Sequence, residues 1–109
     1  MDEKDILCAA NAYSRKYYLG STFNGLPEAV KKELQAAVVL FTAEVGGILT
    51  LSFDDGENLY IHTAAAENDA AYDDISAGLK VKQFQKENKE LLENVQKYYS
   101  MIIKGKGEM

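Results

Sequence analysis

The clearest pattern along the chain is a period-two alternation on both sides of a short polar loop. Residues 48–53 and 59–63 alternate in this way, and the segment 54–58 between them is polar and contains a glycine. A period of two places successive side chains on opposite faces of a β-strand. Two such runs joined by a glycine-containing loop predict a β-hairpin. Its expected buried face consists of Leu49, Leu51, Phe53, Leu59 and Ile61.

The segment 27–45 has the period of an α-helix. Pro27 suits the first helical position, where a backbone N–H has no partner, and Gly46-Gly47 supplies the left-handed residue that ends many helices. Val39 and Leu40 widen the apolar stripe, which predicts that the middle of this helix is covered on more than one side. The stripe itself consists of Val30, Leu34, Ala37, Val38, Phe41 and Val45.

A second, long helix is predicted from about Asn68 to about Ile103, with Asn68 or Asp69 as its cap. From residue 81 onwards the mainly apolar seam steps by three and four, which is the a/d pattern of a heptad repeat with Asn88 at one a position. Gly78 lies where this pattern meets an earlier one, so we expect a bend or break there. The earlier stripe consists of Tyr72, Ile75 and Leu79.

The length of this helix predicts an interface. A straight helix of ~35 residues would be roughly 50 Å long, whereas a compact domain of this size has a radius of gyration of about 13 Å. The helix therefore either breaks near Gly78 or projects. A projecting end would expose a large apolar surface, which soluble monomers rarely tolerate, and a second copy of the chain is the simplest cover. The candidate interface residues are Phe84, Leu91, Leu92, Val95, Tyr98, Tyr99 and Ile102.

The segment 6–20 is harder to interpret. Short apolar or aromatic runs flank a central stretch, 11–14, whose residues favour turns. This arrangement favours a hairpin of two strands. A helix through the alanines remains an alternative, because short apolar runs do not separate the two structures.

Together these elements run β-β-α-β-β-α. This order predicts an α+β fold with a mostly antiparallel sheet, helices on one face and a long C-terminal helix. No linker-like stretch or internal repeat interrupts the chain, so we expect one domain over residues 1–109 with flexible ends at about 1–5 and 104–109.

Composition narrows the possible functions. The chain has 109 residues, of which 47% are hydrophobic and 27% charged, and this is a globular composition. With 17 acidic and 12 basic side chains its net charge is -5, which argues against a nucleic-acid partner. The sequence contains no run of 18 apolar residues, so it predicts no membrane span. The acidic start does not look like a signal peptide, so we expect a cytoplasmic protein of bacterial type.

Few residues offer catalytic chemistry. His62 and Ser52 suggest a Ser-His dyad, but no nucleophile-elbow motif accompanies them. Cys8 lies in an apolar run without a nearby Arg or His, which predicts a buried thiol. The acidic turn 54–58 is too short to wrap a calcium ion. The sequence therefore predicts no catalytic, cofactor-binding or metal-binding residues.

Several stretches together resemble a family of short, uncharacterised bacterial proteins classed as a domain of unknown function. The most specific is Glu44-Val45-Gly46-Gly47-Ile48-Leu49-Thr50-Leu51, and the likeness extends from about Cys8 to Tyr99. The resemblance implies no activity and no catalytic residues. The other stretches are Asn24-Gly25-Leu26-Pro27, Lys32-Glu33-Leu34-Gln35, Tyr72-Asp73-Asp74-Ile75 and Gly78-Leu79-Lys80.

Three functional hypotheses follow. The leading one is a non-enzymatic protein-interaction or regulatory module that acts as a homodimer through the last helix and can bind a protein partner. The alternative is a small-ligand binding or sensing domain with a tyrosine-lined pocket between the sheet and the helices. The third is an enzyme, which His62, Ser52 and an acid within hydrogen-bond reach in a cleft would favour.

Overall fold

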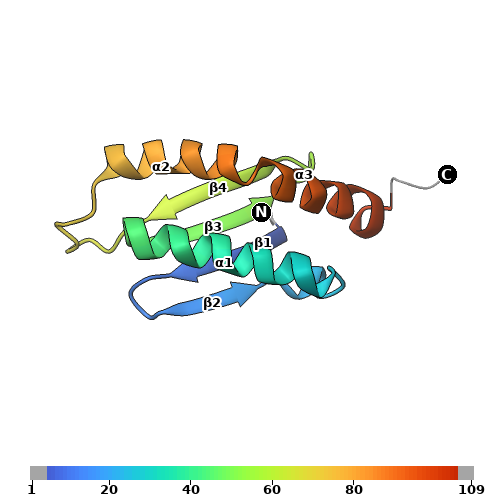
Figure 1. Ribbon diagram of the computed structural model, residues 1–109, viewed down its shortest axis with the longest axis horizontal. Coiled ribbons are helices and arrows are strands. Elements are labelled where there is room, and N and C mark those ends of the chain that lie inside the picture. Colours follow the sequence, from blue (N-terminus) through green and yellow to red (C-terminus); the bar gives the residue numbers. More distant parts are fainter. Residues whose placement is uncertain (1–4, 106–109) are drawn as a thin grey trace.

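The computed structural model describes residues 5–105 and is shown in Figure 1. Its strands are β1 (Asp5–Asn11), β2 (Lys16–Leu19), β3 (Ile48–Phe53) and β4 (Leu59–Ala64). Its α-helices are α1 (Glu28–Val45), α2 (Asp74–Glu87) and α3 (Lys89–Tyr98). A 3-10 turn, Ser21–Phe23, precedes α1, and a π-helical turn, Tyr99–Ile103, follows α3. The expected flexible ends lie largely outside the described residues, although Asp5 already belongs to β1.

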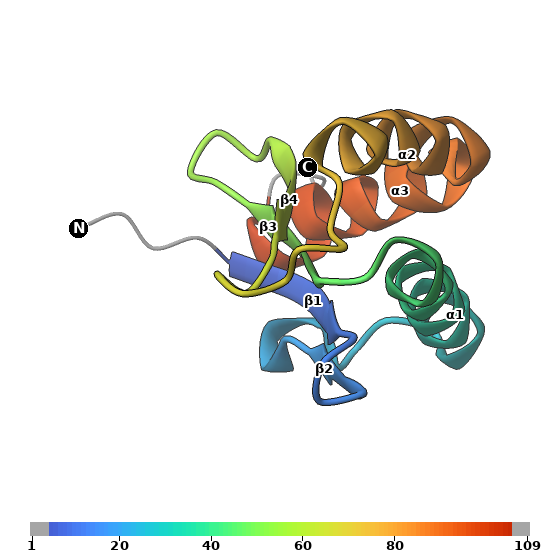
Figure 2. The same ribbon diagram turned by 90° about the vertical axis from the view of Figure 1, so that its left-hand side faces the viewer.

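The four strands form one antiparallel sheet in the order β2-β1-β3-β4. Figure 2 shows the sheet nearly edge-on, with all three helices on the same face. The predicted α+β fold, its antiparallel sheet and the placement of the helices on one face are therefore confirmed. The register of β1 on β3 shifts between Ile6 and Cys8, and this β-bulge lets both Leu7 and Cys8 be fully buried.

Both predicted hairpins form, and the first one shows why the helical alternative fails. The side-chain oxygen of Asn11 accepts the backbone N–H groups of Tyr13 and Ser14, at 2.9 and 3.1 Å. Such a local hydrogen bond competes with helix formation and nucleates a turn. Arg15 completes the reversal in the left-handed region, with φ 58°. The turn-forming residues 11–14 thus determine the structure of the whole stretch 6–20.

Helix α1 matches its prediction closely, with two differences. Pro27 is the N-cap, one position before the first helical residue, and Gly46 ends the helix with φ 85°. Leu34, Val38 and Phe41 are buried against the sheet. Val39 and Leu40 keep 41% and 59% of their surface exposed. The prediction that the middle of α1 is covered on more than one side is therefore wrong within one chain.

The single long C-terminal helix is a wrong prediction, because this segment forms two helices. The break lies at Asn88, whereas Gly78 lies inside α2. The Asn88 amide donates to the backbone oxygen of Phe84 at 2.9 Å, as does its own backbone N–H at 3.0 Å. This residue leaves the helical region with φ -112° and ψ 24°. A short polar side chain that hydrogen-bonds to the backbone favours an interruption of the helix, whereas a glycine only permits one.

The start of this segment also differs from the prediction. The cap is Asp73, not Asn68 or Asp69: its carboxylate accepts the backbone N–H groups of Ile75 and Ser76 and the Ser76 hydroxyl. Hydrogen bonds to the charged form, mainly those from Ser76, lower the pKa of Asp73. The residues before it form a loop that is tied to the first hairpin, because the Tyr13 hydroxyl donates to Asp69 and accepts the N–H of Ala66.

The C-terminal segment docks on the sheet through aromatic rings. The Tyr99 ring stacks on Phe53 with centroids 4.2 Å apart and an angle of 8°, and both rings contact Phe23. All three residues are at most 1% exposed. The Tyr99 hydroxyl donates to a carboxylate oxygen of Asp5 at 2.6 Å, so the polar end of this side chain is satisfied as well.

Removing this ring should cost far more stability than removing a neighbouring apolar side chain. We expect Tyr99→Ala to lower the free energy of unfolding by about 3–5 kcal/mol, because it leaves a cavity in the core. Ile102→Ala is the matched control: this side chain is 63% exposed, and its loss should cost less than about 0.5 kcal/mol. Urea unfolding followed by circular dichroism measures both. Equal losses of unfolding free energy in the two variants would contradict the docking of the C-terminal segment on the sheet.

Candidate functional site

The predicted interface does not form an exposed face. Five of its seven residues lie in the core, with exposed fractions between 1% and 8%. The prediction is wrong for these residues because the break at Asn88 allows α3 to pack its apolar stripe on the chain's own sheet and on α1. The five are Phe84, Leu91, Leu92, Val95 and Tyr99.

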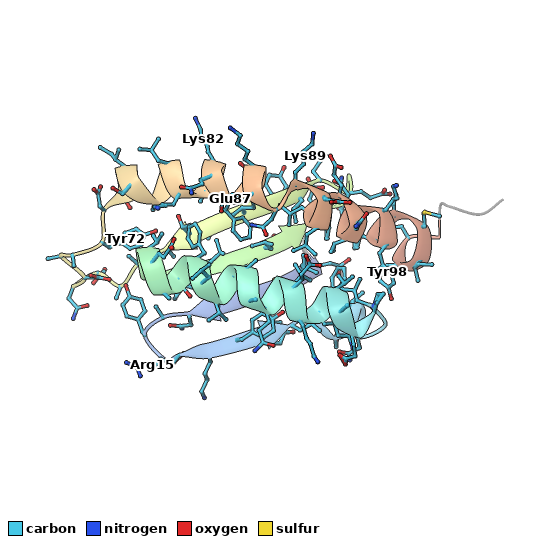
Figure 3. All side chains as sticks on the ribbon, in the orientation of Figure 1. Arg15, Tyr72, Lys82, Glu87, Lys89 and Tyr98 are labelled. Carbon is cyan, nitrogen blue, oxygen red and sulfur yellow. The ribbon has the colours of Figure 1, made fainter. Side chains whose placement is uncertain are left out.

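The remaining two predicted interface residues stay accessible. Tyr98 is half-buried and Ile102 is 63% exposed. Together with Pro27 and Met101 they line a shallow, mainly apolar groove of about 360 Å³ at the C-terminal end of the helical layer. Figure 3 labels Tyr98 at this end, next to the start of α1.

His62 and Ser52 do not make a dyad. His62 is exposed on the face of the sheet that no helix covers, opposite Thr50 in the register, whereas Ser52 is opposite Tyr60 and only 7% exposed. Within residues 5–105, no hydrogen bond joins the two side chains, and no group of three His, Cys, Asp or Glu side chains is placed to hold a metal ion. His62 and Ser52 are therefore diagonal neighbours on adjacent strands and not a bonded pair.

Cys8 is a buried thiol, as predicted. It is fully inaccessible to solvent and lies beside the Tyr17 hydroxyl. Burial raises the pKa of the Cys8 thiol to about 12. The thiolate is the nucleophilic form of cysteine, so this residue is inert at neutral pH.

The acidic turn after β3 fastens the sheet to the C-terminal segment. The Asp54 carboxylate accepts the N–H of Asn58 at 2.9 Å, and this hydrogen bond lowers the pKa of Asp54. Further along the turn, Glu57 accepts the Ser100 hydroxyl with its carboxylate and the Gln96 amide with its backbone oxygen. The acids of this turn thus serve local structure.

The most exposed aliphatic side chains lie on α2. Ile75 is 78% exposed and Leu79 is 64% exposed, one helical turn apart. Lys82 shares this side of the helix, and Figure 3 shows it pointing away from α1 and the sheet. Gly78, between the two aliphatic residues, has open space around it. We call this surface the α2 outer face; it consists of Ile75, Gly78, Leu79 and Lys82. The predicted stripe of Tyr72, Ile75 and Leu79 therefore faces solvent at its last two positions.

A cavity lies between the first hairpin and α1. Its volume is about 830 Å³. One tyrosine, Tyr17, contributes to its wall, so it corresponds only in part to the tyrosine-lined pocket expected from the sequence. The cavity is lined by Ala10, Asn11, Ala12, Arg15, Lys16, Tyr17, Gln35, Val39, Thr42, Ala43 and Gly46.

The fold and these surfaces define a small α+β protein whose antiparallel sheet is covered by helices on one face. The model of a family of unknown function, DUF6145, matches residues 4–107, and the chain belongs to this family. The expected membership in a family of unknown function is thus confirmed. Comparisons with curated proteins and with solved structures gave no significant match. Over the described residues, none of the helices has the length and apolar character needed to span a bilayer.

The burial of Cys8 predicts a large difference in its reactivity between the folded and unfolded states. We expect the folded protein at pH 8 to react with a disulfide reagent such as dithionitrobenzoate only as fast as it unfolds, because the thiol is inaccessible and protonated. The denatured protein should release one equivalent of thionitrobenzoate at once. Fast reaction of the folded protein would contradict the burial of this thiol.

Proposed function

We propose that the protein is a non-enzymatic interaction module that acts as a homodimer through the α2 outer face. The observation that carries this proposal is the exposure of Ile75 and Leu79, two large aliphatic side chains on adjacent turns with most of their surface in water. Amphipathic helices normally turn such residues inward. A second copy that covers them removes apolar surface from water, which stabilises the assembly.

The charges on α2 favour a second copy as the partner. Asp73 and Asp74 stand at the N-terminal end of the helix, whereas Lys82 and Lys86 stand in its C-terminal half. Two copies of α2 packed antiparallel about a two-fold axis near Gly78 would place the acids of each copy beside the lysines of the other. Gly78 has no side chain, so the two helices can approach closely at the centre. A two-fold interface must be complementary to itself, and this helix meets that requirement.

This interface differs from the one that the heptad pattern predicts. Both lie in the segment 68–103, but the proposed contact uses its first helix, whereas the heptad seam belongs mainly to the second one and is buried within the chain. We therefore keep the proposal of a homodimer but assign its interface to α2 in place of the heptad seam.

The interface can be tested by its effect on solution mass. We expect light scattering coupled to size exclusion to give a mass near twice 12.1 kDa for the unchanged protein. The double variant Ile75→Asp with Leu79→Asp should give a folded species near 12.1 kDa, because two carboxylates cannot be buried at a dimer contact without partners.

Two matched controls carry the same chemical change on other exposed apolar surfaces. Leu40→Asp changes the solvent side of α1, and Ile102→Asp changes the accessible part of the interface that the sequence predicts. Both variants should remain dimers. A monomeric unchanged protein at every concentration would overturn the proposal. So would a dimer that survives in the Ile75→Asp, Leu79→Asp variant and dissociates in either control.

The charge arrangement yields a separate prediction. Lys82→Glu with Lys86→Glu should raise the dissociation constant of the dimer, because it places like charges opposite Asp73 and Asp74 of the second copy. Added salt should weaken the dimer of the unchanged protein and strengthen that of the variant, since exposed charges are screened. Analytical ultracentrifugation at low and high salt measures both trends. Identical salt responses would show that these charges do not face each other.

A further inference from the structure

The cavity beside the first hairpin has the size of a small-molecule site. Its volume of about 830 Å³ falls in the range of pockets that bind small ligands, roughly 300–1,000 Å³. It exists because α1 packs on β1 and β3 rather than on β2, and because several residues around it are small. The small residues are Ala10, Ala12, Ala43 and Gly46.

The charge around this cavity is unusual for this protein. The chain carries 17 acidic side chains and a net charge of -5, yet none of the acidic residues within 5–105 lines the cavity. Two adjacent cations do, Arg15 and Lys16, and Arg15 is the only arginine in the sequence. Lys16 and Tyr17 are successive residues of β2, so the Lys16 side chain leaves the strand on the face opposite Tyr17. The Arg15 guanidinium is therefore the charge at the cavity that favours an anion.

The local backbone fixes Arg15 at the rim of the cavity. Asn11 holds the turn through two hydrogen bonds to backbone N–H groups, and Arg15 has the left-handed φ of 58°, which an arginine rarely adopts. Figure 3 shows its side chain at the tip of the hairpin, near the C-terminal end of α1. Its guanidinium takes part in no ion pair with the described residues.

The wall of the cavity is apolar with a few polar groups. Val39 is 41% exposed there, on the side of α1 that its neighbours leave uncovered. The Tyr17 hydroxyl is buried without a hydrogen-bond partner of normal geometry in the described residues, and the polar group beside it is the Cys8 thiol. Burial raises the pKa of Tyr17, so this phenol remains a neutral donor. Gln35 and Thr42 add polar atoms from α1.

We propose that this cavity binds a small organic anion with an apolar body. Arg15 pairs with the anionic group, and the apolar body lies against Val39, Ala43 and the ring of Tyr17. This proposal gives the ligand-binding hypothesis from the sequence a definite site, and it does not depend on the homodimer.

The test uses two probes that differ in charge. The fluorescent 8-anilinonaphthalene-1-sulfonate is an aromatic anion, and N-phenyl-1-naphthylamine is the same ring system without the sulfonate. Fluorescence titration of the full chain should show one saturable site per chain for the sulfonate. The uncharged analogue should bind more weakly, because it cannot pair with Arg15.

Two variants test the positive charge and the volume of the cavity separately. Arg15→Asn removes the guanidinium, and asparagine accepts the left-handed conformation better, so the fold should be kept. It should weaken binding of the sulfonate about tenfold and leave binding of the uncharged analogue unchanged. Ala43→Phe fills the cavity from the solvent-exposed side of α1 and should abolish binding of both probes. Lys89→Asn is the matched control, because it removes one positive charge far from the cavity, as Figure 3 shows.

The outcomes are decisive in both directions. Loss of sulfonate binding in Arg15→Asn and Ala43→Phe, with Lys89→Asn unchanged, supports the site. Sulfonate binding that survives both cavity variants overturns it, and so does binding that only Ile75→Asp with Leu79→Asp removes, since the probe would then be covering the α2 outer face. Thermal melts of every variant show that each one is folded before its binding is measured.

Discussion

The stacking of Tyr99 on Phe53 is the contact on which the arrangement of the helical layer depends. It anchors the end of the C-terminal segment to β3, and the break at Asn88 gives α3 the freedom to lie down on the sheet. Because α3 lies on the sheet, most residues of the heptad-like seam are buried in the core. The apolar surface that remains accessible then lies elsewhere, on α2, on the outer side of α1, at the C-terminal turn and on the two hairpins. The surfaces proposed for function are therefore what this anchoring leaves uncovered.

Most of the fold can be predicted from local patterns, and the errors have a common physical cause. Both hairpins and α1 were predictable because period-two and period-3.6 patterns coincide with turn residues at their ends. A heptad seam, in contrast, shows that a helix has an apolar face but not whether that face meets another chain or its own sheet. Asn88 fits the seam as a polar a position, and it acts as a break because its amide bonds to the backbone of Phe84.

The candidate sites were less predictable than the fold. Ile75 and Leu79 have helical spacing with Tyr72, which suggests a buried stripe, and only the packing of α2 shows that they face solvent. The cavity combines the first hairpin with α1, segments whose proximity no local pattern encodes. Since β2 and β4 are the two edges of the sheet, the cavity and the α2 outer face lie on opposite sides of the molecule (Figure 1). A dimer formed through α2 would leave both of its cavities open to solvent.

The hydrogen bond between Tyr99 and Asp5 has a consequence for how the protein is made. It joins residues 94 positions apart, and the strand that begins at Asp5 is one of the two central strands of the sheet. During synthesis the hairpins and α1 leave the ribosome without the ring that completes their core. A nascent chain that stops before residue 99 therefore exposes Phe23 and Phe53, and the core of the sheet is completed only after residue 99 has been made. Contacts of such long sequence separation also slow folding, so the C-terminal segment adds its share of the stability late.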